Sequence, residues 1–429
     1  MSRQYSPLQI QNSHLHQSHS TQQASSSKTL LWGEGLRGCA AFLVVIFHLF
    51  WVFIEHAHKE DVMGTVGRNG TDVYFWQLPI LRFFIAGGAA QVGIFFVLSG
   101  VVLSYKLLCY IRDGNVDQVA KSVQSACFRR FFRLAVPATC ANVVTFLLIV
   151  CGLQSHNRPP YPPPSLPDSF LSKLYVLVRE SIRTFTVGSN GFDEIQWTMR
   201  PELYGSILVF MYCFLASRLQ LKDRGLIAFI LAIYFLFAQI WYLTPFFLAI
   251  LISECIVNGQ KKYWHRWLSF VLFPLGLYIG SYPEYQHENT TWSNQLHIIG
   301  SWLGFPDSQH HHWGYMSGLA IVSAVALNQT LQSFFCTRPM LYLGRISFSM
   351  YLFHGPMLKS IAAYLFWIFN EQLNFNNNIT ALAMTLIIFM PLLFFVSEIG
   401  TRTMDRWGVE VGRKVDGYLN RPVENKEII

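Results

Sequence analysis

The sequence predicts an all-α protein, a polytopic membrane bundle of about ten transmembrane helices. Two observations carry this prediction. Hydrophobic residues make up 52% of the 429 residues and charged residues only 13%, whereas soluble globular chains are roughly 25% charged. The apolar residues also gather in runs of about the length that an α-helix needs to cross a bilayer, roughly 20 residues. Since a lipid-exposed segment must satisfy its own backbone hydrogen bonds, such runs indicate helices.

The apolar runs define the predicted spans in chain order. The run 225–257 is too long for one span, and we divide it at Leu243-Thr244-Pro245 because proline interrupts a helix. A further surface helix is expected near 169–186, within a long extramembrane loop. The predicted spans are 36–54, 86–108, 134–153, 201–217, the two halves of 225–257, 267–281, 313–327, 346–369 and 379–399.

Two features accompany these spans. Gly93 and Gly100 in the second span are seven residues apart, so they share a helix face and should let another helix approach closely. Basic residues precede two spans and are expected in loops, one ending in Arg129–Arg133 and another holding Arg338 and Arg345.

The distribution of Lys and Arg predicts the orientation. An even number of spans places both termini on one side, and the basic residues collect there, while the opposite segments 282–312 and 370–378 contain none. The positive-inside rule therefore predicts cytosolic termini. The basic residues at the even-numbered ends of the spans are those of the C-terminal tail and Lys106, Arg112, Lys121, Arg129, Arg130, Arg133, Arg218, Lys222, Arg224, Lys261, Lys262, Arg266, Arg338 and Arg345.

The ends of the chain differ in composition from its apolar centre. Residues 1–28 are rich in Gln, Ser and His, which predicts a disordered cytosolic tail. Residues 29–401 form the predicted membrane domain, and 402–429 a polar cytosolic tail. The glycosylation sequons at Asn69, Asn289 and Asn378 fall in predicted luminal segments, which agrees with a glycoprotein of the endoplasmic reticulum, another secretory-pathway membrane or the plasma membrane.

Several site classes are not expected. The eight cysteines contain no Cys-x-x-Cys pair, and we predict no structural disulfide. The net charge of +8 is not gathered in a basic run with interleaved aromatics, so we predict no nucleic-acid partner. His310-His311-His312 has no nearby Cys or acidic partner, so no metal site is expected.

Arg37 and His48 are the first candidate functional pair. They are eleven residues apart, which on an α-helix is ~1100° of rotation and roughly 16 Å of rise, so they share a face. With Arg37 at a membrane edge, His48 lies near mid-depth, where an ionisable side chain is costly and is a functional candidate. Imidazole is a common general base near neutral pH. The alternative is a histidine that is simply hydrogen-bonded within the bundle.

Other polar groups extend this candidate site. Arg37, Arg130 and Arg133 lie at the predicted cytosolic edge, where guanidinium groups could bind phosphate or could anchor the helices to lipid headgroups. Glu202 begins the fourth span on the predicted luminal side, where the helix dipole also favours an acid. Ser, Tyr and His residues of 344–356 could line a polar cavity or form hydrogen bonds between helices.

Together these residues resemble the membrane acyltransferase family 3. The elements that carry the resemblance occur in order and span most of the chain. They are Leu36-Arg37-Gly38 with His48, Gly93-Ile94-Phe95-Phe96-Val97-Leu98-Ser99-Gly100, Arg130-Phe131-Phe132-Arg133 with Pro137, Trp197-Thr198 with Glu202, and Ile346-Ser347-Phe348-Ser349-Met350-Tyr351-Leu352-Phe353-His354-Gly355-Pro356.

The resemblance implies an O-acyltransferase without a permanently bound cofactor. It implies acetyl-CoA, or another acyl-CoA, as co-substrate, and a hydroxyl acceptor that we expect to be a secondary metabolite or a glycan. It implies an essential His48 and donor-site arginines at Arg37, Arg130 and Arg133. We further expect Glu202 to orient the acceptor or His48 and Ser99 to belong to the donor site. Only about 30 residues follow the last span, so we expect a fungal-type member without a fused C-terminal hydrolase-like domain. The alternatives are a multi-pass transporter with His48 as proton relay and a non-catalytic membrane scaffold.

Overall fold

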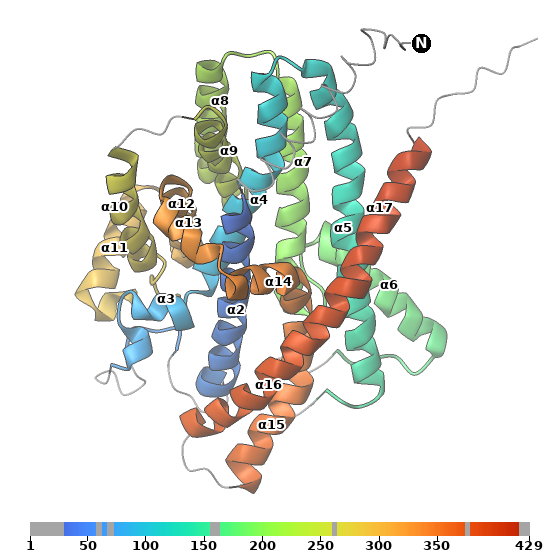
Figure 1. Ribbon diagram of the computed structural model, residues 1–429. Helices are drawn as coiled ribbons and strands as arrows, with labels where there is room; N and C mark the ends of the chain where they lie inside the picture. The colour runs from blue at the N-terminus through green and yellow to red at the C-terminus, as the bar shows by residue number, and fades with distance from the viewer. Residues whose placement is uncertain are drawn as a thin grey trace, which may run out of the picture.

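The computed structural model describes residues 30–56, 62–66, 73–154, 164–259, 264–373 and 378–419. These parts of the chain are helical and contain no β-strand (Figure 1). The predicted all-α membrane bundle is therefore confirmed. The predicted N-terminal tail, residues 1–28, and the sequon at Asn69 lie outside the described residues.

The described residues form the following helices. In chain order they are α2 (Leu31–Phe50), η1 (Trp51–His56), η2 (Phe75–Gln77), α3 (Leu81–Ile85), α4 (Gly88–Arg112), α5 (Val116–Val150), α6 (Phe170–Thr186), η3 (Glu194–Thr198), α7 (Met199–Leu215), α8 (Leu221–Phe237), η4 (Trp241–Leu243), α9 (Thr244–Val257), α10 (Trp264–Ile279), η5 (His287–Asn289), α11 (Thr291–Trp302), α12 (His310–Leu327), α13 (Gln329–Phe335), α14 (Arg338–Met357), η6 (Leu358–Ala362), α15 (Ala363–Trp367), η7 (Ile368–Gln372), α16 (Asn378–Gly400), η8 (Thr401–Asp405) and α17 (Arg406–Leu419).

Several described segments can cross a membrane by their length and composition. Five do so as continuous helices, and α12 with α13, bent by 105° at their junction, makes a sixth if the pair is one broken span. Trp241–Val257 and Arg266–Ile279 are shorter apolar helices. The five are Leu31–Ile54, Gly88–Arg112, Val116–Val150, Arg338–Gln372 and Asn378–Leu419.

Close glycine contacts bring α2, α4 and their neighbours together at the centre of the bundle (Figure 1). A Cβ atom on Gly38 of α2 would lie 2.2 Å from the backbone nitrogen of Gly344 in α14. A Cβ atom on Gly93 of α4 would lie 2.3 Å from the carbonyl oxygen of Gly314 in α12, and one on Gly100 would lie 2.6 Å from Ala249 of α9. The predicted close approach at Gly93 and Gly100 is confirmed, and the two glycines contact different helices, α12 and α9.

Two predicted loops are wrong. Arg129–Arg133 lie in the middle of α5, which is continuous from Val116 to Val150, and Arg338 and Arg345 lie within α14. The reason is that hydropathy marks the edge of an apolar run, whereas a helix can continue into polar residues where no helix-breaking residue stands. The α5 sequence before Arg129 contains neither Gly nor Pro, and Pro339 in the first turn of α14 favours helix initiation.

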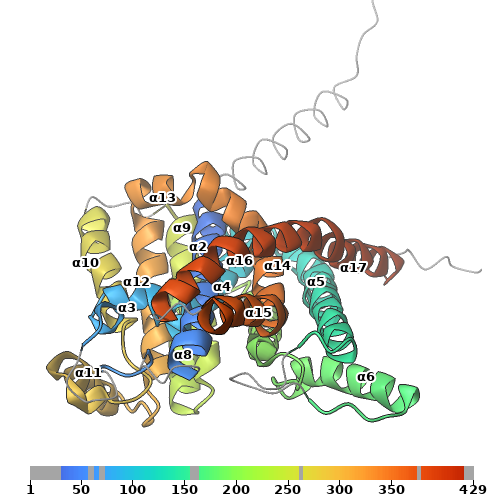
Figure 2. The ribbon, with the colours of Figure 1, turned by 90° about the horizontal axis from the view of Figure 1, so that it is seen from below.

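Residues 402–419, which the sequence assigns to a polar tail, form η8 and α17. Figure 2 shows α17 running beside α5. Gly408 and Gly412 allow this approach, since a Cβ at either position would lie 3.0 to 3.2 Å from the nearest atom of α5. Asp416 also pairs with Arg129 at 2.9 Å. The end of the membrane domain is therefore packed against the helix that carries the arginine motif.

The structure also shows where the predicted surface helix, the cysteines and the predicted glycosylation sites lie. The predicted surface helix is α6, whose apolar side chains include the exposed Phe170, Leu171 and Tyr175. All eight cysteines are free. Of the predicted glycosylation sites, Asn289 ends η5 and Asn378 begins α16.

Candidate active site

His48 has one defined tautomer. Its Nδ1 atom lies 2.8 Å from the carbonyl oxygen of Val44, one turn earlier in α2. A carbonyl oxygen only accepts hydrogen bonds, so Nδ1 carries the proton and donates it. The Nε2 atom therefore presents a lone pair, and His48 lines a cavity enclosed by described residues. This is the tautomer that a general base requires.

A second histidine, His354 of α14, contacts His48. Its side chain is fully buried, its Nδ1 donates to the carbonyl oxygen of Tyr351 at 2.7 Å, and its Nε2 lies 3.4 Å from Nδ1 of His48. The Nε2 lone pair of His354 therefore faces the N–H of His48. The sequence placed His354 in a polar segment but did not indicate this partner, since the pairing depends on how α2 and α14 align.

The cavity beside His48 has a volume of about 320 Å³, within the range of small-molecule sites. Most of its wall is apolar or aromatic, and the polar side chains are spaced around it. The lining residues are Val44, Phe47, His48, Trp51, Val52, Met63, Gly88, Ala89, Val92, Glu194, Ile195, Trp197, Glu284, His310, His311, Tyr351, Gly355, Leu358 and Lys359. Among the described residues, no group of three or more His, Cys, Asp or Glu side chains is arranged to hold a metal ion.

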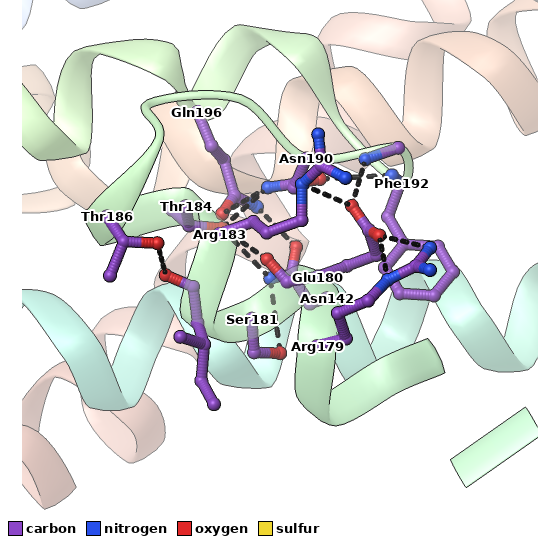
Figure 3. A network of polar contacts seen from close by, with 12 residues as sticks. Asn142, Arg179, Glu180, Ser181, Arg183, Thr184, Thr186, Asn190, Phe192 and Gln196 are labelled. Carbon is purple, nitrogen blue, oxygen red and sulfur yellow. Dashed lines mark hydrogen bonds and ion pairs between the residues drawn. The ribbon is translucent and has the colours of Figure 1, made fainter. Parts of the chain in front are cut away.

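Buried polar contacts hold the segment between α6 and α7, which supplies one wall of the cavity (Figure 3). The Glu180 carboxylate accepts the backbone N–H of Gly191 at 2.8 Å. The Asn190 side-chain oxygen accepts a backbone N–H at 2.7 Å, and Gln196 donates to Asn142 of α5 at 3.0 Å. Because each contact is directional, the network fixes the position of the η3 residues that face the cavity.

The predicted donor-site residues also come together. Arg130 pairs with Glu202 and donates to Ser99 at 2.8 Å and to Ser206 at 2.9 Å. Arg37 is close enough to this group for its charge to interact with those of Arg130, Arg133 and Glu202. The family elements on α2, α4, α5 and α7 thus converge on one polar cluster, which we call the arginine cluster: Arg37, Ser99, Arg130, Arg133, Glu202 and Ser206.

Arg37 and His48 both face α14, as their helical spacing predicts. Arg37 donates from Nε to the Ser347 hydroxyl at 3.1 Å, and His48 contacts His354 two turns further along the same helix. Helix α14 therefore connects the arginine cluster with the histidine pair.

Glu202 lies in the arginine cluster and not beside His48. Its Oε1 atom contacts Arg130 and Ser99, while its Oε2 atom is buried and accepts no hydrogen bond from the described residues. Arg133 differs from Arg130 because it is exposed and makes no hydrogen bond with the described part of the chain. The cluster therefore contains a fixed ion pair, a free carboxylate oxygen and an accessible guanidinium.

Comparisons with known proteins identify the family of this chain. Residues 30–398 match a family model described as an acyltransferase domain. A protein named O-acetyltransferase PaAT-1, from Phomopsis amygdali, is 25% identical over 437 residues, covering 89% of this chain and 83% of the relative. A protein named acyltransferase clz18, from Cochliobolus lunatus, is 23% identical over 424 residues, covering 84% and 89%. No solved structure matches the chain. The chain therefore belongs to the membrane acyltransferase family 3, and it is an acyltransferase enzyme of the membrane.

Proposed function

We propose that this enzyme transfers an acetyl group from acetyl-CoA to a hydroxyl group of a small-molecule natural product or a glycan, with His48 as general base. The observation that carries the proposal is the Nε2 lone pair of His48 at a ligand-sized cavity. The relative named as an O-acetyltransferase supports acetyl as the transferred group.

The reaction uses His48 twice. The acceptor hydroxyl donates its proton to Nε2 of His48 as its oxygen attacks the thioester carbonyl carbon. The carbon–sulfur bond then breaks, and the departing CoA thiolate takes the proton back from His48. During the intermediate stage the imidazolium keeps its Nδ1–H directed at the Val44 carbonyl oxygen and toward Nε2 of His354. His354 is therefore a positioning residue for the base.

The arginine cluster supplies the donor site in this proposal. Arg133 is exposed and offers a planar guanidinium, which binds phosphate through two parallel hydrogen bonds. Arg37 adds positive charge nearby. The Oε2 atom of Glu202 can accept an N–H of the pantetheine arm, because the described residues leave it without a donor. The arm would then run along α2 across the roughly 16 Å that separates Arg37 from His48.

We place both termini in the cytosol, in a membrane of the endoplasmic reticulum, another secretory compartment or the cell surface. The support is the Lys and Arg residues on the side of the arginine cluster and their absence from 282–312 and 370–378. Acetyl-CoA then enters from the cytosol. In this orientation the sequons at Asn289 and Asn378 are on the luminal side.

The test uses purified protein and labelled acetyl-CoA. Replacing His48 with Ala should lower transfer by about 10²- to 10⁴-fold, the usual contribution of a general base. Arg37→Ala should raise the KM for acetyl-CoA. His287→Ala, at a histidine that does not line the cavity, is the matched control and should retain activity. Undiminished transfer by His48→Ala would refute the base assignment. Comparing metabolites of deletion and parent strains identifies the acceptor through the acetylated product that is lost.

A further inference from the structure

Two histidines at the start of α12, His310 and His311, form another part of the cavity wall beside His48. In both rings the Nδ1 atom is buried and has no hydrogen-bond partner among the described residues. The other ring nitrogen, Nε2, is therefore the atom that a ligand in the cavity can reach. The catalytic sequence described above does not use either side chain.

The buried Nδ1 atoms indicate where the imidazole protons lie. A neutral imidazole carries one N–H and one lone pair. A buried N–H without an acceptor loses its hydrogen bond to water and costs about 1–3 kcal/mol. Placing the proton on Nε2 gives it an acceptor, water or a ligand, and leaves a lone pair at the buried Nδ1, and proteins bury an unpaired acceptor more often than an unpaired N–H. His310 and His311 thus present N–H donors to the cavity, whereas His48 presents a lone pair.

Packing alone does not require histidine at these positions. The His311 ring stacks on Trp241, with centroids 5.0 Å apart and planes 15° apart, and meets Trp197 edge-on at 5.7 Å. A phenyl ring would fill the same space without burying an unpaired nitrogen. The aromatic contacts instead hold the His311 ring in a fixed orientation, which suits a group that must direct a hydrogen bond.

The other polar groups of the cavity are largely engaged with protein partners. Glu194 and Lys359 form an ion pair at 3.2 Å, and the Tyr351 hydroxyl donates to the Ile195 carbonyl oxygen at 2.6 Å. The intervening wall includes Phe47, Trp51, Val92, Trp197 and Leu358. Such a lining favours a mostly apolar ligand with few polar atoms. Each ligand hydroxyl that found no partner in the cavity would lose its hydrogen bonds to water, which is costly.

We propose that His310 and His311 bind a second oxygen atom of the acceptor, so that the acceptor is a predominantly apolar small molecule carrying at least two oxygens. One oxygen is the hydroxyl that His48 activates, and the other is a carbonyl, ether or hydroxyl oxygen that accepts from Nε2–H. This inference rests on the proposed function, and it favours an apolar natural product over a glycan as the acceptor.

The experiment measures binding and needs no turnover. Matched bicyclic alcohols, 2-decalol and 6-hydroxy-2-decalone, differ by one ketone oxygen and are titrated calorimetrically into the purified protein in detergent. The ketone should tighten binding about tenfold, as one added hydrogen bond of roughly 1.4 kcal/mol gives. The gain should vanish in the double variant His310→Phe, His311→Phe, which keeps aromatic rings at both positions. An equal affinity for both alcohols, including failure of both to bind, would overturn the proposal.

Two controls separate this proposal from the others. His312→Phe alters the neighbouring buried histidine, which does not line the cavity, and should retain the tenfold gain. His48→Ala should also retain it, because both alcohols carry the hydroxyl that contacts His48 and both lose that contact equally. A retained gain together with an active His48→Ala enzyme would leave the oxygen-binding site intact and refute only the base. Equal affinity of the unmodified enzyme for both alcohols, together with an inactive His48→Ala enzyme, would refute only the oxygen-binding site.

Discussion

Replacing His354 tests whether its contact with His48 contributes to catalysis. The Nδ1–H of His48 has two acceptors, the Val44 carbonyl oxygen at 2.8 Å and Nε2 of His354 at 3.4 Å. In the proposed mechanism His48 takes a proton from the substrate hydroxyl and its ring becomes a cation, so the two hydrogen-bond acceptors then stabilise a charged donor. In His354→Leu one acceptor is lost, while Val44 still fixes the tautomer. We therefore expect slower chemistry and an intact acetyl-CoA site.

The distance sets the magnitude of this effect. A hydrogen bond to a charged group contributes about 1.5–3 kcal/mol, and 3.4 Å is longer than the usual N–H donor distance of about 2.7–3.2 Å. The contribution should thus be near the lower limit, which corresponds to a decrease of about tenfold in kcat. His48→Ala, which removes the base itself, should cost far more.

The assay compares three proteins under single-turnover and steady-state conditions. His354→Leu should lower kcat about tenfold with the KM for acetyl-CoA unchanged, because the arginine cluster is distant from His354 along α14. His354→Gln should recover part of the loss, since its amide oxygen can accept where Nε2 did. Thermal unfolding in detergent controls for the complete burial of His354.

Two results would contradict this reasoning. If His354→Leu and His354→Gln lose the same activity in proportion to their loss of thermal stability, His354 only fills space. If His354→Leu is as inactive as His48→Ala while folded, then His354 itself touches a reacting group and is more than a positioning residue.

Four further predictions concern other parts of the fold. Arg133→Gln should raise the KM for acetyl-CoA about fivefold. The unfolding temperature should not change, since the exposed guanidinium makes no hydrogen bond with the described residues. An unchanged KM would show that Arg133 does not belong to the proposed donor site. Arg130→Gln should instead destabilise the enzyme by about 3 kcal/mol, because it leaves the Glu202 carboxylate without its cation, and denaturant titration measures this. Gly93→Ala should cost about 1–3 kcal/mol through the clash with Gly314, whereas Gly417→Ala, with no atom within 4 Å, should cost nothing. Burial raises the pKa of the Asp193 carboxyl to about 6, so the contribution of the protonated carboxyl to stability is complete below about pH 4 and is lost as the pH rises through 6. Asp193→Asn should abolish this part of the pH dependence of the unfolding temperature. A variant whose unfolding temperature follows the same pH profile as the unmodified enzyme would contradict the assignment.

Helical periodicity predicted the parts of the fold and site that depend on one helix at a time. The fold class follows from the apolar runs, and the shared face of Arg37 and His48 follows from their spacing, which the contacts to Ser347 and His354 confirm. The close approach at Gly93 follows from the absence of a side chain. Each of these inferences needs only local geometry, so the sequence is sufficient.

Features that depend on the alignment of two helices were not predictable in this way. Glu202 was expected near the luminal surface because it begins an apolar run, yet α7 begins where Arg130, in the middle of the long helix α5, can reach its carboxylate. Hydropathy could not show this, because it assigned Arg130 to a loop at the opposite membrane edge. Once α5 is continuous through Arg130, the charged side chain is held inside the bundle and needs an acidic partner, since a buried cation is stable only when it is paired. The length of α5, a property of backbone continuity, therefore decides which carboxylate joins the arginine cluster. In the proposed function, the imidazole of His48 then acts on the acceptor without a carboxylate partner.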